Sequence, residues 1–307
     1  MSSHESVSAD LLSIICCPFC KADLSIKGNG QLVCSGCGDV FPIQENILIF
    51  VKEHDRTEQT EEYKIRQTAA RKHEKARTED ILKVVSRHHC IPVMDRWASQ
   101  FRQQFHGSQW ILDAGCGTGY YWRHSVPGGK LLLMDFVFDN LKVAQSLLRG
   151  RQDIFLMQAD IMCLPLKVHS FSGLWSVQVF QHFPAGLLQQ ALKELDRILA
   201  EKFRAEIINL NPALFRQCFY RLCGKKYHTR GSLDQMLLNR LGPDEWAQAC
   251  QTFRPGLRDI RFDYTEIFFH PGVVLPLYPV LLENVFRRWP RLARALGNQI
   301  HLKLISS

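Results

Sequence analysis

Residues 111–121 read ILDAGCGTGYY, and this segment constrains the fold more than any other part of the chain. Two apolar residues lead into Asp113, and Gly115, Gly117 and Gly119 follow at alternate positions. Glycines after a buried strand allow positive φ angles and let the backbone approach a ligand closely. The G-x-G-x-G spacing differs from the G-x-G-x-x-G spacing of dinucleotide-binding turns. The segment therefore predicts a buried strand that ends in a ligand-binding turn.

The chain after residue 110 alternates between strand-like and helix-like stretches. Apolar runs at WILD, KLLLMD, IFLMQAD, SGLWSVQV and AEIINLN predict strands. Helices are expected from about residue 120, over 138–148, over 184–199 and near Asp244. Such alternation requires crossover connections and indicates a mainly parallel α/β sheet with helices on both faces. Before it, Met94, Trp97, Phe101 and Phe105 recur at helical spacing and predict a helix that caps the edge of this sheet.

Three acids are expected at the carboxyl ends of successive strands, where ligands of such sheets bind. Asp113 precedes the glycines directly; there it repels phosphates and suits a positively charged ligand. Asp135 ends the second strand, 22 residues further on, and can accept hydrogen bonds from both hydroxyls of a ribose. Asp160 follows the third strand and could bind the exocyclic amine of adenine. A tight turn with solvent-facing acids is the alternative for any one residue, but the ordered set favours S-adenosylmethionine (SAM).

The stretch from about residue 110 to 210 resembles the class I SAM-dependent methyltransferases, with a type 11-like domain. The resemblance is carried by ILDAGCGTGYY, LLLMDFVFDNLKVA, QADIMCLPLKVHSFSGLWSVQVFQHF and LKELDRIL, in the order and spacing of that family. It implies a Rossmann-like fold, catalysis of methyl transfer and SAM as the cofactor. One position departs from the family pattern, because Ser172 stands where an aspartate is common.

The resemblance also assigns the cofactor-binding residues. It implies that residues 113–119 surround the methionine part of SAM, Asp135 holds the ribose, Asp160 and Ile161 flank the adenine, and Gln178 lines the pocket. The full expected set is Asp113, Gly115, Cys116, Gly117, Gly119, Asp135, Phe136, Asp160, Ile161 and Gln178.

The N-terminal segment CPFCKADLSIKGNGQLVCSGC holds two C-x-x-C pairs separated by thirteen residues. Each pair can form a tight knuckle, and two knuckles joined by a hairpin give the four thiolates of a closed, structural zinc site. The expected ligands are Cys17, Cys20, Cys34 and Cys37. A redox C-x-x-C is the alternative, but two pairs at this spacing fit a zinc ribbon better. Residues 11–50 resemble the small zinc-ribbon activator proteins of tRNA and release-factor methyltransferases.

These observations divide the chain into a zinc ribbon at 8–51, a charged linker with capping helices at 52–106 and a methyltransferase domain at 107–307. Within the last, residues 211–243 form a long insert that mixes aromatic and basic residues. It could form a lid over an amphipathic or anionic substrate or bind RNA, and the alternative is that it packs as a helical cap. The N-terminus lacks the pattern of a secretion signal, and we expect a cytoplasmic protein.

The acceptor of the methyl group is left open by the sequence. His182 follows the fourth strand and is a candidate general base, although it could equally pack or cap. The leading hypothesis is O-, N- or C-methylation of a small-molecule, lipid-like or glycan acceptor. The alternative is an RNA (tRNA or rRNA) or protein methyltransferase that uses the ribbon for recognition, and the third is a non-catalytic binding module.

Charge is distributed unevenly along the chain. The net charge is +8, and residues 201–307 contribute +7 of it, which would suit an anionic substrate, RNA or a membrane surface. Residues 285–296, VFRRWPRLARAL, alternate basic with apolar residues and predict peripheral contact with an anionic membrane. The alternative is that the apolar half packs beneath the sheet and the arginines are solvated.

Overall fold

The structure is a computed structural model of the 307-residue chain. It describes residues 7–28, 30–51, 91–224, 226–227, 232–233, 236–254, 257, 259–265, 285, 288–297 and 299–306. Residues 52–90 of the expected linker and capping helices at 52–106 lie outside the described residues, as do Phe286 and Arg287 of the basic segment.

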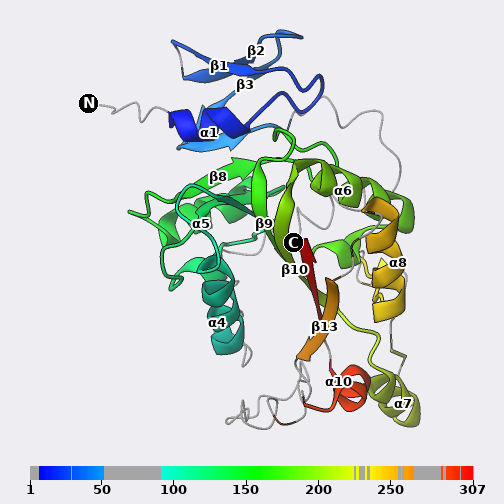
Figure 1. Cartoon of the computed structure of the whole chain (residues 1–307). Coiled ribbons are helices and arrows are strands. Elements are labelled where there is room, and N and C mark those ends of the chain that lie inside the picture. Colours follow the sequence, from blue (N-terminus) through cyan, green and yellow to red (C-terminus); the bar gives the residue numbers. More distant parts are fainter. Residues whose placement is uncertain are drawn as a thin grey trace.

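A nine-stranded sheet in the order β13-β14-β10-β9-β6-β7-β8-β5-β4 runs through the molecule (Figure 1). The five expected strands are β6 (Trp110–Ala114), β7 (Lys130–Asp135), β8 (Ile154–Gln158), β9 (Phe171–Val177) and β10 (Leu199–Leu210), and they pair in parallel. Two further strands, β13 (Asp259–Thr265) and β14 (Gln299–Ser306), extend the sheet with antiparallel pairing beyond β10. The sheet is therefore mixed, with a parallel centre.

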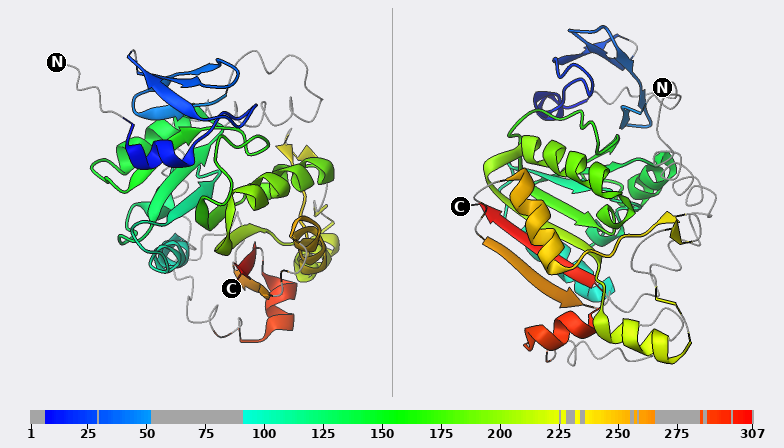
Figure 2. Two further views of the ribbon diagram at one scale, coloured as in Figure 1. Left: turned by 45° about the horizontal axis from the view of Figure 1, so that its top comes forward. Right: turned by 90° about the vertical axis from the view of Figure 1, so that its right-hand side faces the viewer.

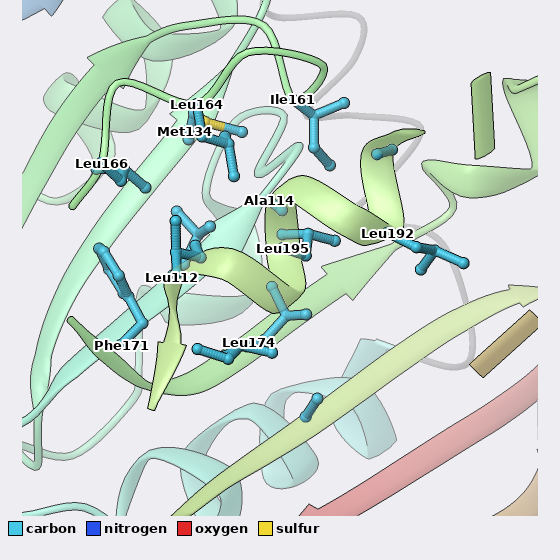
Figure 3. Close-up of a cluster of buried hydrophobic side chains, with 14 of the residues drawn as sticks. Leu112, Ala114, Met134, Ile161, Leu164, Leu166, Phe171, Leu174, Leu192 and Leu195 are labelled. Carbon is cyan, nitrogen blue, oxygen red and sulfur yellow. The ribbon is translucent and has the colours of Figure 1, made fainter. Parts of the chain in front are cut away.

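Helices cover both faces of the sheet, because successive side chains of a strand point to opposite faces and every side chain of β6 is buried. Leu112 and Ala114 face α6 (Ala185–Ile198) and α8 (Pro243–Phe253) in one buried cluster (Figure 3). Ile111 faces the opposite cluster, which includes side chains of α4 (Ile91–Arg102) and α5 (Phe138–Leu147). The parallel strands are buried on both faces, which fits their continuous apolar sequences.

Two expectations about helices were wrong. The helix from residue 120 is only the short 3-10 turn η2 (Tyr120–Trp122), because the chain soon reaches Pro127 and the Gly128–Gly129 pair that precede β7. The capping helix exists as α4, but Trp97 and Phe101 pack onto a face of the sheet rather than its edge, against Leu131 and Trp175 among others.

The N-terminal ribbon consists of α1 (Ala9–Ile14) and a three-stranded antiparallel sheet of β1 (Leu24–Lys27), β2 (Gln31–Cys34) and β3 (Val40–Phe41). The next two strands, β4 (Ile43–Gln44) and β5 (Ile47–Ile49), leave this small sheet and join the large one. β5 pairs in parallel with β8, with Ile47 opposite Leu156 and Ile49 opposite Gln158. The edge of β8 is thus covered by the ribbon's own chain.

The ribbon and the large sheet also share a hydrophobic core. Leu32 and Phe41 of the ribbon are fully buried in the same cluster as Leu112 and Leu174 of the sheet. The ribbon lies directly on one end of the α/β unit (Figure 2). It is therefore part of the folded body of the protein.

The insert after β10 contains α7 (Leu214–Leu222) and the short hairpin of β11 (Ser232–Leu233) and β12 (Met236–Leu237). Near the C-terminus, α10 (Pro290–Leu296) lies beside α7 (Figures 1 and 2).

Candidate cofactor site and metal centre

The glycine turn after β6 has the backbone geometry that the sequence predicts. Gly115, Gly117 and Gly119 all have positive φ angles, of 77°, 54° and 65°. A Cβ at Gly115 would lie 2.3 Å from Cγ2 of Val179, and one at Gly119 would touch Leu133 and α5, whereas Gly117 faces open space. The turn is therefore packed on two sides and accessible at Gly117, where a ligand could approach the backbone.

Asp135 connects the glycine turn to the next strand end. Its Oδ2 accepts a hydrogen bond from the amide of Gly117 at 2.8 Å, and its Oδ1 accepts one from the amide of Val137 at 2.8 Å. Nδ2 of Asn140 donates to the same Oδ1 at 3.2 Å. Donors on both oxygens hold the carboxylate in one orientation at the carboxyl end of β7. The sequence analysis missed Asn140, although its position five residues after Asp135, at the start of a predicted helix, could have indicated it.

Asp113 is directed into the protein. Its Oδ2 accepts a hydrogen bond from Nε1 of the fully buried Trp122 at 2.6 Å. Burial raises the pKa of Asp113 to about 7, against the Trp122 hydrogen bond that lowers it, and the nearby Asp135 carboxylate raises the pKa further. A cationic group bound close to this carboxyl would favour its ionised form.

The raised pKa of Asp113 makes stability depend on pH. A carboxyl group with an ordinary pKa of 3.8 and a folded pKa of about 7 binds its proton more tightly in the folded state. Its contribution to the free energy of unfolding is therefore full below about pH 4, falls as the pH rises to about 7 and is constant above that, with a loss of at most about 4 kcal/mol. Urea unfolding between pH 4.5 and 8 gives the free energy of unfolding of the cofactor-free wild type and of Asp113→Asn as a function of pH. We expect the wild type to lose stability relative to Asp113→Asn as the pH rises. A constant difference between the two proteins would contradict the raised pKa of Asp113.

The other expected cofactor residues lie along the same edge with different exposures. Asp160 follows β8 and accepts a hydrogen bond from the amide of Met162 at 2.9 Å. Gln178 follows β9 with an unusual φ of 58°, and Phe136 follows β7. The side chain of Ile161 is only 5% exposed and packs in the core with Leu192 and Leu195 (Figure 3).

Cys116 is half-buried within the glycine turn, where its Sγ lies 3.4 Å from the carbonyl oxygen of Gly117. Burial, together with the carboxylates of Asp135 and Asp113, raises the pKa of this thiol well above its ordinary value. The Cys116 side chain is therefore a neutral thiol that lines the turn, and it is not a nucleophile.

His182 ends the short 3-10 helix η3 (Phe180–His182), which follows β9. The neighbouring Gln181 is almost fully buried, and its Oε1 accepts a hydrogen bond from the amide of Leu210 at 2.9 Å. This fixes the Gln181 amide so that its Nε2 faces Nε2 of His182 at 3.3 Å and donates to it. His182 is thereby oriented, with its proton on Nδ1. Sequence reasoning singled out the histidine and missed Gln181, which stands next to it in QHF.

The four expected metal ligands come together. Sγ of Cys17 lies 3.7 Å from Sγ of Cys37, Sγ of Cys20 lies 3.3 Å from Sγ of Cys34, and all four atoms lie within 4.8 Å of one another. Tetrahedral Zn–S bonds of about 2.3 Å put the sulfurs about 3.8 Å apart, so the set fits zinc. Each close contact joins the two knuckles, which favours one four-thiolate site over two redox pairs.

The backbone prepares these thiols for a metal. The amides of Gly36 and Cys37 point at Sγ of Cys34, at 3.3 and 3.4 Å. Burial opposes ionisation of Cys34, but these donors and the Cys20 thiol lower its pKa to about 6. A thiolate is the form that binds a metal.

The ribbon is hydrogen-bonded to the segment that carries Asp160. The amide of Phe50 donates to the carbonyl of Gln158 at 2.8 Å, and the amide of Cys16 donates to the carbonyl of Pro165 at 3.0 Å. Nζ of Lys21 donates to the carbonyl of Leu164 at 3.0 Å and pairs with Glu194 of α6 at 3.2 Å. Both sides of residues 158–165 are thus tied to the module that holds the cysteines.

Comparison with known proteins divides the chain into the same two parts. Residues 111–202 match the family of the methyltransferase domain, and residues 8–46 match the family of Trm112p-like proteins. A UPF0434 protein of Methylobacillus flagellatus is 39% identical over 57 residues, which are 18% of this chain and 95% of that protein. A malonyl-[acyl-carrier protein] O-methyltransferase of Hamiltonella defensa is 42% identical over 60 residues, 19% of this chain, so the match spans only 21% of that enzyme.

Solved structures match much of the chain at low sequence identity. A complex between the Haloferax volcanii Trm112 methyltransferase activator and a putative methyltransferase has a TM-score of 0.48 and 16% identity, covering 69% of this chain and 88% of the other. A geranyl diphosphate C-methyltransferase from Streptomyces coelicolor has a TM-score of 0.49 and 14% identity, covering 76% and 87%. The chain therefore combines a methyltransferase domain at residues 111–202 with a Trm112p-like zinc-ribbon module ahead of it.

Proposed function

We propose that this protein transfers the methyl group of SAM to a small-molecule or lipid-like acceptor, with a glycan as the remaining member of that class. The observation that carries the proposal is the pairing of the open Gly117 turn with the oriented carboxylate of Asp135 at the carboxyl ends of β6 and β7. SAM supplies an activated methyl group on a sulfonium, which an acceptor lone pair takes in line while the C–S electron pair returns to sulfur.

In this proposal the residues of the chain bind the cofactor and orient it toward the acceptor. Asp135 would hold the ribose hydroxyls, Asp113 would balance the cationic end of the cofactor, and Asp160 would lie at the adenine. Most of the catalysis then comes from holding the two reactants in line in a site that matches the disappearing positive charge. Any proton that leaves the acceptor needs a base, and His182 is the candidate at this edge of the sheet.

In this structure Nε2 of His182 accepts a hydrogen bond from Nε2 of Gln181. An acceptor hydroxyl or ammonium group would have to displace that donor before His182 could take its proton. We expect His182→Ala to lower kcat about 10²–10⁴-fold, with SAM affinity unchanged. Gln181→Ala is the matched test of orientation and should lower kcat less. An unchanged kcat in His182→Ala would leave orientation of the reactants alone as the source of catalysis.

The insert after β10 bears on the acceptor class. The chain that leaves β10 enters α7, whose Leu214 and Phe215 are 63% and 59% exposed. Exposed apolar side chains on the segment that follows β10 suit an acceptor with a hydrocarbon part. Incubation of the protein with methyl-labelled SAM and an extract of cells that lack its gene, followed by separation into lipid, nucleic acid, protein and small-molecule fractions, identifies the class. Label in the lipid or small-molecule fraction supports the proposal, and label in RNA or protein overturns it.

The second candidate is methylation of RNA or protein. It is supported by the Trm112p-like module and by the +7 charge of residues 201–307. For the ribbon we propose a structural role with one zinc ion, because its cysteine knuckles grip the segment at Asp160 and face the core of the catalytic domain.

A further inference from the structure

Helix α7 exposes an apolar face. Of the eleven large apolar side chains that are exposed among the described residues, four lie on this nine-residue helix. They are Leu214 at 63%, Phe215 at 59%, Phe219 at 50% and Leu222 at 87% exposure. Isolated exposed apolar residues are common, but a cluster of this size on one short helix marks a contact surface.

Helix α10 extends this face. Nδ2 of Asn211, just before α7, donates to the carbonyl of Arg294 at 2.9 Å and to that of Gly297 at 2.8 Å, so the start of α7 is tied to the end of α10 (Figure 2). Trp289 precedes α10 and is 60% exposed. We define the α7–α10 surface as the apolar side chains of Leu214, Phe215, Phe219, Leu222 and Trp289, together with the exposed arginines Arg221, Arg288 and Arg291.

The charges on this surface have one sign. The sequences of α7 and α10 contain Arg216, Arg221, Arg291 and Arg294 and no acid. Arg221, Arg288 and Arg291 are exposed, and Arg294 pairs with Asp244 of α8 at 3.0 Å. A partner for this surface should therefore be anionic at its boundary and apolar beneath it.

We propose that the α7–α10 surface docks onto an anionic lipid bilayer, with the apolar side chains in the acyl–headgroup boundary and the arginines at the headgroups. Leu214 and Leu222, the two most exposed members, have no ring on which an RNA base could stack, which favours lipid over RNA. The contact is peripheral: no described helix is both long and apolar enough to cross a bilayer.

The structure revises which residues make the contact. In the expected segment 285–296, Ala293 is buried and Leu296 packs against the core, so part of its apolar side turns inward. Trp289 and the arginines remain outside, and α7 supplies most of the apolar area. α7 follows β10, whose Leu210 amide is bonded to Gln181, so the docked face lies next to the edge that carries His182.

Co-sedimentation of the full chain with vesicles tests the proposal without cofactor or acceptor, so it stands or falls separately from the proposed function. Vesicles with about a third phosphatidylserine should bind the protein at low salt. Binding should fall at high salt, because attraction between charges is screened over about 10 Å at 0.1 M salt. Arg288→Ala and Arg291→Ala should each weaken binding about fivefold at low salt.

The apolar face is tested by Phe215→Asp and Leu222→Asp, each expected to weaken vesicle binding at least tenfold. Val168→Asp is the matched control. Val168 is 58% exposed, nearly the same fraction as Phe215, but it precedes β9 and so lies at the opposite end of that strand from His182. A melting temperature equal to that of the wild type verifies that each variant is folded. A variant with a lower melting temperature is replaced by Leu214→Asp.

Three results would overturn the proposal. The first is no sedimentation with anionic vesicles at low salt. The second is equal binding by Phe215→Asp, Leu222→Asp and the wild type. The third is retention on RNA or self-association that the same substitutions abolish, in the absence of vesicle binding.

Discussion

Replacing Cys34 with serine should remove about one equivalent of zinc and destabilise the whole protein. Cys34 is buried in the hydrophobic cluster that the ribbon shares with the large sheet, and its thiol contacts Cys20 at 3.3 Å. Loss of the metal releases the knuckles that hold residues 158–165 and frees β5 from β8. Structural zinc contributes about 10–16 kcal/mol in small modules, which is comparable to the stability of an entire domain. We therefore expect the variant to be insoluble, or to be unfolded in the same way as the wild-type protein after a chelator has removed its metal.

Elemental analysis of zinc and thermal unfolding measure this effect together. Cys218→Ser is the matched control, because Cys218 is an exposed cysteine on α7, away from the cluster. It should retain zinc and the melting temperature of the wild type. Full zinc content in Cys34→Ser, or an unchanged melting temperature after zinc loss, would contradict the structural role.

Replacing Asp135 with alanine should weaken SAM binding about 5- to 150-fold, the equivalent of roughly 1–3 kcal/mol. The substitution removes the acceptor for the ribose hydroxyls and also releases the amides of Gly117 and Val137. Asp135→Asn separates the two effects, since its side-chain oxygen can still accept one of these amides.

Calorimetry with SAM and with S-adenosylhomocysteine gives the affinities. Asp139→Ala is the control, because Asp139 is in the first turn of α5, four residues away, and its side chain is 37% exposed. Similar losses for both ligands are expected, since both carry the ribose. Wild-type affinity in Asp135→Ala would mean that another acid binds the ribose.

The parallel centre of the sheet could be predicted from the sequence because each strand is a short apolar run between glycine, proline or acidic residues. The strand DIRFDYT alternates apolar and polar residues, yet its place beside β14 depends on a pairing across more than thirty residues. α4 shows the same limit: its apolar stripe predicts a helix, but only the assembled core decides which surface it covers. The pairing of β5 with β8 is likewise set by the fold.

The candidate site divides in the same way. Asp113, Asp135 and the glycines follow from local patterns, because a strand end and a turn are local events. Their partners do not: Trp122 reaches Asp113 only through the curl of the turn, and Lys21 meets Glu194 from 173 residues away. Such contacts arise from tertiary packing, so side-chain orientation and the pKa of Asp113 required the structure.

The pairing of β5 with β8 also bears on stoichiometry. A helper subunit that binds its enzyme from solution is lost on dilution and must be produced in matching amounts. Here the strand that covers β8 belongs to the same polypeptide, so its docking is intramolecular and its extent is independent of protein concentration. The β8 edge is already filled by Ile47–Ile49, which leaves no room there for a strand of a second, separate chain. Each polypeptide therefore carries its Trm112p-like module in a fixed one-to-one ratio with its methyltransferase domain.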